Sequence, residues 1–254
     1  MMAELDAELH SMLLYYGIPS IILCYIVYQT FSLRRAKLRV EAFFFNLICG
    51  WVHRKFCNKE KTLLFDQLQH LKQQSPNRTF KVLEIGVGSG MNFKYYPRGT
   101  EVTCVDPNPF HEQYVIKNLR KAQKNLKLVS FIKGFAENMP QVESNAYDVV
   151  LCTLTLCSVR QPAAVLQEVK RVLKPGGAFF YLEHVAAQKG SFIRRVQDKL
   201  QYIWPKFSGG CNINRETWTF LDKSGFTYVD YSHYSVNTWL AFFARPCLYG
   251  SATK

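Results

Sequence analysis

The chain has 254 residues, of which 48% are hydrophobic and 20% are charged. This length and composition suit one α/β domain with additional segments and exclude a chain too polar to build a core. The net charge of +13 favours acidic partners, either nucleic acid or anionic lipid, without choosing between them. The eight cysteines include no CxxC pair, so their spacing predicts neither a zinc site nor a disulfide framework and favours reduced, buried thiols in a cytosol-facing domain.

The first predicted element is an uncharged stretch, residues 12–33, that is rich in Leu, Ile, Val and Tyr. As a helix it can reach across a hydrocarbon core of about 30 Å, although Pro19 would kink it, and a shallow hairpin or a tilted insertion is an alternative. Acidic residues precede it where a signal peptide would be basic, and the basic cluster follows it. The positive-inside rule therefore predicts a membrane anchor over residues 1–35 with the rest of the chain in the cytosol, and a buried core helix is the competing interpretation.

A second apolar stretch, residues 42–52, contains three consecutive phenylalanines and a tryptophan but is too short to span a membrane. Basic residues flank it on both sides, which is typical of a helix that lies at the membrane interface. A helix packed against the following domain is the alternative, because aromatic and basic residues suit either position. Residues 36–76 are therefore predicted to form interfacial and linker helices.

From residue 80 onward apolar strand patterns alternate with helical ones. The predicted strands are residues 81–85, 101–105, 126–131, 147–152 and 178–183, with a terminal pair at 226–232 and 238–244. The predicted helices are residues 90–95, 109–123, 162–173 and 217–224. A basic, aromatic insert at 185–212 interrupts the pattern. The alternation predicts a Rossmann-like α/β sheet with helices on both faces over residues 77–254.

The first predicted strand runs into a turn with glycines at alternate positions, Gly86, Gly88 and Gly90, and Glu84 stands two residues before the first of them. Glycines let the backbone approach a ligand closely. The spacing G-x-G-x-G differs from the dinucleotide fingerprint, and a pyrophosphate would disfavour a nearby acid. A ligand with a sulfonium and an ammonium group suits the acidic rim, which points to S-adenosylmethionine, with Glu84 near its amino acid end. The alternative is that Glu84 caps the turn or pairs with a lysine.

Asp106 ends the second predicted strand, sixteen residues after Gly90. The carboxyl ends of parallel strands meet at one edge of a sheet, where nucleotide-type ligands bind. We therefore expect Asp106 to accept hydrogen bonds from both hydroxyl groups of a ribose.

Several sequence blocks, taken together and in this order, resemble those of the class I S-adenosylmethionine-dependent methyltransferases: LEIGVGSG, VTCVDPNP, GFAENMP, YDVVLCTLTLCSV and VLKPGGAFFYLEHV. More specific segments resemble those of the methyltransferase-like 7 family, the membrane-associated thiol S-methyltransferases. These segments are NFKYYP, CTLTLCSV, GGAFFYLEHVAA, CNINRETW and RPCLYG. The resemblance implies a methyltransferase fold, S-adenosylmethionine as cofactor and a small thiol as methyl acceptor. It also implies that the three glycines form the cofactor loop, that Asp106 binds ribose, and that Thr153 contacts methionine or substrate.

Within GFAENMP, the resemblance places Ala136 and Glu137 at the edge of the adenine. Phe135 stands where many members of the wider class have aspartate. A carboxylate for the adenine amino group is therefore missing unless Glu137 supplies it. Stacking of Phe135 on the adenine and ordinary core packing are both open.

The predicted ends of the fourth and fifth strands carry the candidates for acting on the acceptor. A thiol with a pKa near 8.5 needs only modest help to become the nucleophilic thiolate. His184, with Glu183 beside it, is the candidate general base, and a hydrogen bond from His184 to a loop backbone is the alternative. Cys157 fits a small buried hydrophobe better than a reactive group. Aromatic residues of the insert region are predicted to line an apolar pocket, with core packing as the alternative: Phe192, Tyr202, Trp204, Phe207 and Trp218.

Taken with these patterns, the resemblance implies an enzyme that methylates small, lipophilic thiols at the cytosolic face of the endoplasmic reticulum membrane, with lipid droplets as a further location. Membrane lipid is an expected partner and a metal is not. Only Tyr114 and Phe131 flank the basic stretch at 113–136, whereas RNA binding favours interleaved aromatic residues. A solvated helix face is the preferred interpretation of this stretch, contact with lipid headgroups comes next, and nucleic acid is disfavoured because of the predicted membrane anchor. Two alternatives stay open: a methyltransferase of the same fold acting on lipid, another small molecule or RNA, and a non-catalytic membrane or lipid-droplet protein.

Overall fold

The computed structural model describes Ser20 and residues 31–56, 58–74, 78–122, 126–206, 208–236 and 242–254. The chain divides into two compact units, Met1–Phe44 and Phe45–Lys254. The predicted membrane segment, residues 12–33, lies almost wholly outside the described residues and stays a prediction. Within the described part of the chain, no helix combines the length and the apolar character that crossing a bilayer requires.

Helix α3 (Phe31–Phe56) begins in the first unit and includes the whole of the predicted interfacial stretch. Its phenylalanines are unusually open to solvent for their type: Phe43 is 54% exposed and Phe44 is 51% exposed. Their rings meet edge to face, with centroids 5.5 Å apart. Lys37 lies one turn before Glu41 on the same helix, 4.0 Å from it.

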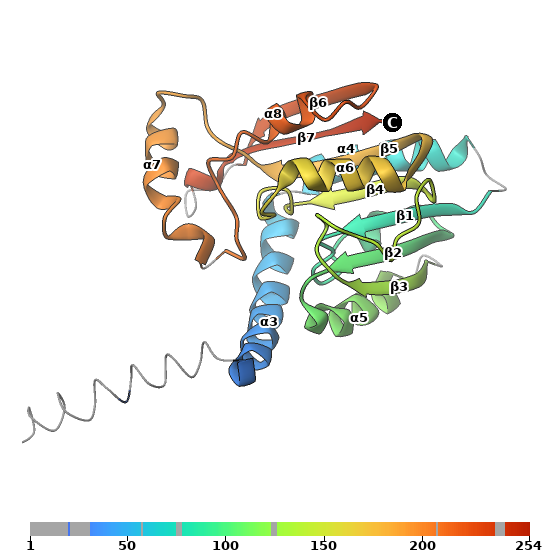
Figure 1. Ribbon diagram of the computed structural model, residues 1–254, viewed down its shortest axis with the longest axis horizontal. Helices are drawn as coiled ribbons and strands as arrows, with labels where there is room; N and C mark the ends of the chain where they lie inside the picture. Colours follow the sequence, from blue (N-terminus) through green and yellow to red (C-terminus); the bar gives the residue numbers. More distant parts are fainter. Residues whose placement is uncertain are drawn as a thin grey trace, which may run out of the picture. The chain divides into compact units, whose positions relative to one another are not determined.

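The second unit is built on a seven-stranded sheet with the order β3-β2-β1-β4-β5-β7-β6 (Figure 1). Five strands are parallel, and β7 runs antiparallel between β5 and β6. The chain moves outward from β1 to β3 and then returns to β4 on the other side of β1, so the switch point of the sheet lies between β1 and β4. The strand bounds are β1 Phe80–Ile85, β2 Thr100–Asp106, β3 Lys127–Lys133, β4 Tyr147–Thr153, β5 Leu173–His184, β6 Tyr228–Ser235 and β7 Pro246–Thr253.

Alternate residues of the strands supply two separate cores, one on each face of the sheet. In β1, Leu83 and Ile85 belong to the core that packs on α6 (Pro162–Val172) and α8 (Thr217–Asp222). Val82 belongs to the other core, which packs on α4 (Asn58–Gln73) and α5 (Glu112–Ala122). The predicted Rossmann-like sheet with helices on both faces is therefore confirmed.

The remaining elements are short or lie in the insert. Helix α7 (Phe192–Leu200) is the one α-helix of the described part of the insert. The 3₁₀ turns are η2 Phe93–Tyr95, η3 Pro109–His111, η4 Trp204–Lys206 and η5 Phe242–Ala244. The helix predicted at 90–95 is thus reduced to η2, which ends just before Pro97, where a helix cannot continue.

The last predicted strand, residues 238–244, is wrong at its described end, because residues 242–244 form η5 and the strand is β7, Pro246–Thr253. The sequence of β7 contains proline and glycine, which weaken a strand signal. Gly250 is needed there, since a Cβ atom at this position would lie 2.0 Å from the backbone oxygen of Asp230 in β6. Close packing between the two strands, invisible in the local pattern, therefore explains the error.

Candidate active site

The turn after β1 has three glycines in the left-handed region of backbone space, with φ of 65° at Gly86, 53° at Gly88 and 74° at Gly90. The turn is also tightly enclosed. A Cβ atom on Gly86 would lie 2.1 Å from the hydroxyl oxygen of Thr155, and one on Gly88 would lie 2.5 Å from a ring carbon of Phe45. The glycines are therefore required by both conformation and space.

Asp106 is the last residue of β2, and only 4% of it is exposed. Its Oδ2 accepts a hydrogen bond from the backbone N–H of Gly88 at 2.9 Å, and its Oδ1 accepts one from the N–H of Asn108 at 2.8 Å. The Nδ1 atom of His111 lies 3.0 Å from the same Oδ1. A carboxylate has about four acceptor positions, so Asp106 retains capacity for a ligand hydroxyl while it holds the glycine turn in place.

Two further groups surround this carboxylate. The ring of Phe45 lies 5.2 Å from the ring of His111, which is itself 8% exposed. In the glycine turn, the hydroxyl of Ser89 is buried and has no hydrogen-bond partner among the described residues. Buried hydroxyl groups are normally paired, so Ser89 offers an unused hydrogen-bonding group at the turn.

Glu84 is buried beneath the turn, with 1% of it exposed. Its Oε1 accepts from the Nδ2 of Asn92 at 2.8 Å, and its Oε2 accepts from the hydroxyl of Tyr96 at 2.7 Å. The Asn92 side chain also accepts from Lys61 Nζ at 2.6 Å and donates to Thr153 Oγ1 at 2.9 Å. Burial raises the pKa of Glu84 to about 7, although its hydrogen bonds oppose this shift. The network fastens Glu84 to residues that follow the turn, in agreement with the alternative that Glu84 has a structural role at the turn. A contact of Glu84 with a cofactor stays a prediction.

The block after β3 contains the residues predicted at the adenine edge. Ala136 is 7% exposed. The Oε1 of Glu137 accepts from the backbone N–H of Arg160 at 2.9 Å, and its Oε2 is buried without a hydrogen-bond partner among the described residues. Phe135 is 57% exposed, so it is not an ordinary core residue. Of the two interpretations of Phe135, stacking on the adenine therefore stays a prediction.

Glu183, near the end of β5, is fully buried and shapes the loop that follows β4. Its Oε1 accepts from the N–H of Thr155 at 2.9 Å and from the thiol of Cys152 at 3.3 Å. Its Oε2 accepts from the N–H of Cys157 at 3.1 Å. Burial raises the pKa of this carboxyl group. Both oxygens are thus engaged inside the protein, which favours a positioning role for Glu183.

His184, the last residue of β5, lies next to two cysteines. Its Nδ1 is 3.8 Å from the Sγ of Cys211, and one ligand-type atom from each of Cys157, His184 and Cys211 lies within 4.8 Å of the other two. The neighbouring thiol of Cys211 and burial raise the pKa of Cys157 well above its usual value. The sequence analysis missed Cys211, because it lies in the insert, 27 residues after His184, and no local spacing joins the three residues.

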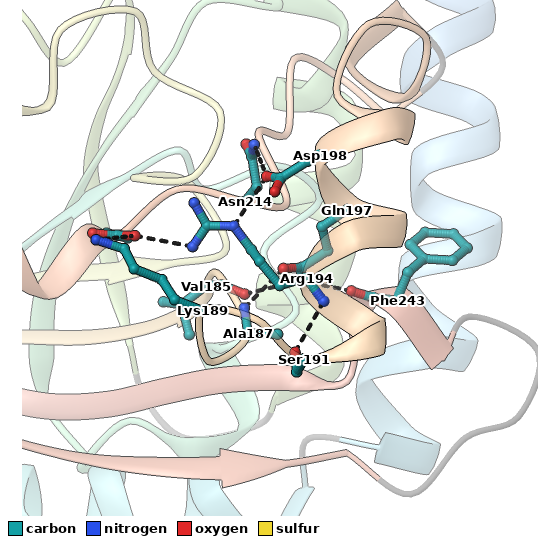
Figure 2. A network of polar contacts seen from close by, with 10 residues as sticks. Val185, Ala187, Lys189, Ser191, Arg194, Gln197, Asp198, Asn214 and Phe243 are labelled. Carbon is teal, nitrogen blue, oxygen red and sulfur yellow. Dashed lines mark hydrogen bonds and ion pairs between the residues drawn. The ribbon is translucent and has the colours of Figure 1, made fainter.

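A polar network around α7 holds the insert against the residues that directly follow β5 (Figure 2). The side-chain oxygen of Gln197 accepts from the N–H of Ala187 at 2.8 Å, and its amide donates to the carbonyl oxygens of Val185 and Phe243 at 3.2 and 2.8 Å. Arg194 adds an ion pair to Asp198 within α7 and another to Glu216, which follows the insert, at 2.9 Å each. Helix α7 therefore has a defined position beside the residues that follow β5.

The aromatic residues predicted to line a pocket behave differently from one another. Trp204 packs edge to face on Phe243, with centroids 4.8 Å apart, next to the small core that includes both cysteines. Phe192 and Tyr202 are 65% and 81% exposed, which excludes core packing for both. Trp218 packs against the larger core, and residue 207 lies outside the described residues.

Comparison with known proteins gives consistent results. The family model described as "Methyltransferase domain" matches residues 83–181. The human protein named thiol S-methyltransferase TMT1A is 40% identical over 196 residues, which are 77% of this chain and 78% of the human one. Thiol S-methyltransferase TMT1B from Rattus norvegicus is 44% identical over 175 residues, which are 69% of this chain and 70% of the rat one.

Among solved structures, an S-adenosylmethionine-dependent methyltransferase from Methanosarcina mazei has a TM-score of 0.55 at 18% identity and covers 72% of this chain and 96% of its own. The [4+2]-cyclase SpnF also has a TM-score of 0.55, at 17% identity, and covers 76% of this chain and 80% of its own. These likenesses concern the fold. Because a cyclase shares it, the reaction must be argued from the site.

Proposed function

Because the chain belongs to the family of the thiol S-methyltransferases TMT1A and TMT1B, we propose that it transfers the methyl group of S-adenosylmethionine to the sulfur of a small thiol. The observation that carries this proposal is the 40% and 44% identity to these relatives over more than two thirds of both chains. The resemblance expected from the sequence blocks is thereby confirmed.

The residues around the glycine turn fit S-adenosylmethionine. Asp106 is buried at the end of β2, accepts from the N–H of Gly88, and still has acceptor capacity for a ribose hydroxyl group. The buried, unpaired hydroxyl of Ser89 adds a hydrogen-bonding group at the turn. The glycine turn follows β1, which borders the switch point between β1 and β4, and Asp106 ends the neighbouring strand β2. Such an edge of an α/β sheet is where nucleotide-type ligands bind.

The protein's own contribution to the reaction is binding, alignment and exclusion of water. S-adenosylmethionine supplies an activated methyl group, which is transferred by in-line displacement. Asp106 would hold the ribose, and the glycine turn, which is fixed to Asp106 through the N–H of Gly88, would lie against the ligand. Glu183 holds the loop after β4 in place through the N–H groups of Thr155 and Cys157. Such alignment accounts for a large share of the rate in reactions whose donor is already activated.

We extend the proposal to lipophilic thiols taken up at the cytosolic face of the endoplasmic reticulum membrane, with lipid droplets as a second location. The support is the aromatic and basic character of α3, where exposed phenylalanines lie between clusters of arginine and lysine. In the second unit, α7 and the turn after it expose further large apolar side chains beside basic ones: Phe192, Tyr202 and Ile203. Aromatic and basic residues together favour the interface of anionic membranes.

The decisive experiment uses purified full-length protein with methyl-labelled S-adenosylmethionine. The acceptors are a series of thiols, the corresponding alcohols and amines, phospholipid vesicles and RNA. We expect label on thiols and none on the matched alcohols, because thiolate forms far more readily near neutral pH. Label that appears only on lipid, RNA or amines would overturn the thiol assignment.

A further inference from the structure

Three ligand-type side chains from distant parts of the sequence meet where β4 and β5 end. Cys157 lies in the loop after β4, His184 ends β5, and Cys211 lies in the insert. One sulfur or ring nitrogen from each lies within 4.8 Å of the other two. In a tetrahedral zinc site with bonds of about 2.0–2.3 Å, ligand atoms are about 3.3–3.8 Å apart, so small side-chain rotations bring these three atoms to metal-binding distances.

We propose that Cys157, His184 and Cys211 bind one zinc ion, whose fourth position takes the acceptor thiol as a thiolate. The inference rests on the proposed thiol methylation and assigns the group that activates the acceptor. Two thiolates, one imidazole and one open position form a known type of catalytic zinc site. The sequence predicted no metal, because the three ligands are brought together by the order of the sheet and by the insert rather than by local spacing.

Hydrogen bonds fix the backbone of the proposed ligands. The carbonyl oxygen of Cys157 accepts from the N–H of Asn212 at 2.8 Å and from its side-chain amide at 3.1 Å, which ties the loop after β4 to the segment that carries Cys211. The N–H of Cys157 donates to Glu183 Oε2 at 3.1 Å. Such outer contacts orient metal ligands and maintain affinity.

The surrounding charges match a dication held by two thiolates. A zinc ion and two thiolates are together neutral. Glu183 is buried nearby, and the guanidinium of Arg215, which donates to the carbonyl oxygens of Leu156 and Val159, offsets its charge. Burial lowers the pKa of Arg215, and the neighbouring Glu183 and cysteines oppose this shift. Before the acceptor thiolate binds, the cluster is therefore neutral overall, which avoids the large cost of an unpaired internal charge.

One side of the proposed zinc site is packed against apolar side chains, and the loop on its other side contacts the glycine turn. Ile213 and both cysteines form a small core, with Leu200, Trp204 and Phe243 packed against it. An apolar shell strengthens metal–thiolate bonds and suits a lipophilic acceptor. Thr155, two residues before Cys157, contacts the carbonyl oxygen of Gly86 at 3.4 Å. A single short loop therefore connects the proposed metal site with the glycine turn.

The reaction balances without an oxidant or a reductant. On binding to zinc, the acceptor thiol loses its S–H proton to solvent, because the metal stabilises the thiolate at neutral pH. Its sulfur then forms a bond to the methyl carbon. The bond from this carbon to the sulfonium sulfur of the donor breaks, and the electron pair stays on the donor, which becomes a neutral thioether. The methylated product carries no negative charge, so it binds zinc weakly and dissociates.

The test begins with the metal content of full-length protein purified without chelators and supplied with zinc(II). We expect about one zinc per chain, and at least about tenfold weaker zinc binding in Cys157→Ser, Cys211→Ser and His184→Ala. Replacement by cobalt(II) should give the visible bands of a tetrahedral site and a sulfur-to-cobalt charge-transfer band, which Cys211→Ser weakens. Cys104→Ser is the matched control, since Cys104 is an equally buried thiol in β2, outside the cluster, and this variant should keep its zinc.

Three results would overturn the inference. One is full zinc content in Cys211→Ser. The second is an intact mass two hydrogens lighter in the natively purified protein, lost in Cys211→Ser, which would show a Cys157–Cys211 disulfide instead. The third is full-rate thiol methylation by protein from which the metal has been removed. That result would refute the role of zinc and would leave the proposed function unaffected. Conversely, stoichiometric zinc with no methylation of any thiol would refute the proposed function and the acceptor's place on the metal together.

Discussion

At the scale of single residues, Asp106 connects the two turns of the candidate cofactor site, the one after β1 and the one after β2. One carboxylate holds the turn after β1 through Gly88 and the turn after β2 through Asn108. A ligand that binds this carboxylate therefore finds both turns already in position. Such preorganisation lowers the entropic cost of binding.

Asp106→Asn tests this assignment while it preserves the shape of the side chain. The amide retains one acceptor oxygen, but its NH₂ group faces an N–H donor, and the charge that strengthens bonds to ribose is lost. We expect cofactor binding to weaken by about 2–4 kcal/mol, measured by isothermal titration calorimetry. Asp230→Asn, at an exposed carboxylate in β6, is the control and should bind normally. Near-normal affinity in Asp106→Asn would contradict the ribose-binding role.

Glu84 gives the stability of the protein a characteristic dependence on pH. Its pKa is raised to about 7 from an ordinary value of 4.5, because burial outweighs the hydrogen bonds from Tyr96 and Asn92 and the attraction of Lys61. The folded state therefore binds this proton more tightly than the unfolded state does. Its stabilising contribution is present below pH 4.5 and is lost as the pH rises toward 7, by about 3 kcal/mol in total.

The measurement is urea unfolding of the cofactor-free protein between pH 5 and pH 8. Between these values the wild type should lose more stability than Glu84→Gln, because the amide cannot titrate and can still accept from Tyr96. The sign is diagnostic, since a carboxylate held charged by Lys61 would give the opposite slope. Identical pH profiles for the two proteins would show that Glu84 does not titrate in this range.

At the scale of elements, the turn after β1 combines a special backbone conformation with close packing. Gly86 and Gly99 both have positive φ, 65° and 72°, but they differ in their surroundings. A Cβ on Gly86 would lie 2.1 Å from Thr155, whereas a Cβ on Gly99 would have nothing within 4 Å. The pair separates the cost of backbone strain from the cost of a steric clash.

We expect Gly99→Ala to destabilise the protein by about 1 kcal/mol, which is the ordinary cost of a left-handed alanine. Gly86→Ala should cost about 3 kcal/mol or more, because it must also displace the loop that Thr155 and Glu183 hold. Denaturant unfolding measures both values, and cofactor binding should be lost only in Gly86→Ala. Equal losses of stability in the two variants would show that the turn has room that the structure does not indicate.

An element could be predicted from the sequence where a local residue pattern specifies it, and could not where contacts between distant residues specify it. Strands β1, β2, β4 and β5 are largely buried in a parallel sheet, so they appear as apolar runs that the sequence displays directly. Strand β3 lies at the edge of the sheet and is only partly buried. Strand β7 contains proline and glycine and is specified by its two neighbours, so the pattern placed it too early. The turn with Asp106 was predictable because its residues are adjacent to strand ends. The meeting of Cys157, His184 and Cys211 was not, since it depends on the path of the insert.

At the scale of the whole molecule, the net charge of +13 and the exposed aromatic residues of α3 suit the same partner. Anionic lipid attracts basic side chains, and the membrane interface accommodates phenylalanine rings. An enzyme held at a membrane meets lipophilic acceptors at a raised local concentration, whereas water-soluble acceptors gain nothing. The proposed membrane attachment should therefore change the choice of substrate rather than the chemistry.

Deletion of residues 1–35 separates these effects. The truncated protein should methylate a short, water-soluble thiol with unchanged kcat/KM, because the described catalytic unit begins at Phe45. In the presence of vesicles with the composition of endoplasmic reticulum lipid, its kcat/KM for a long-chain thiol should fall about tenfold or more relative to the full-length protein. Vesicle flotation, measured in parallel, shows whether attachment itself is lost. Unchanged turnover of the long-chain thiol with vesicles present would refute delivery of the acceptor through the membrane, since the anchor would then serve location alone.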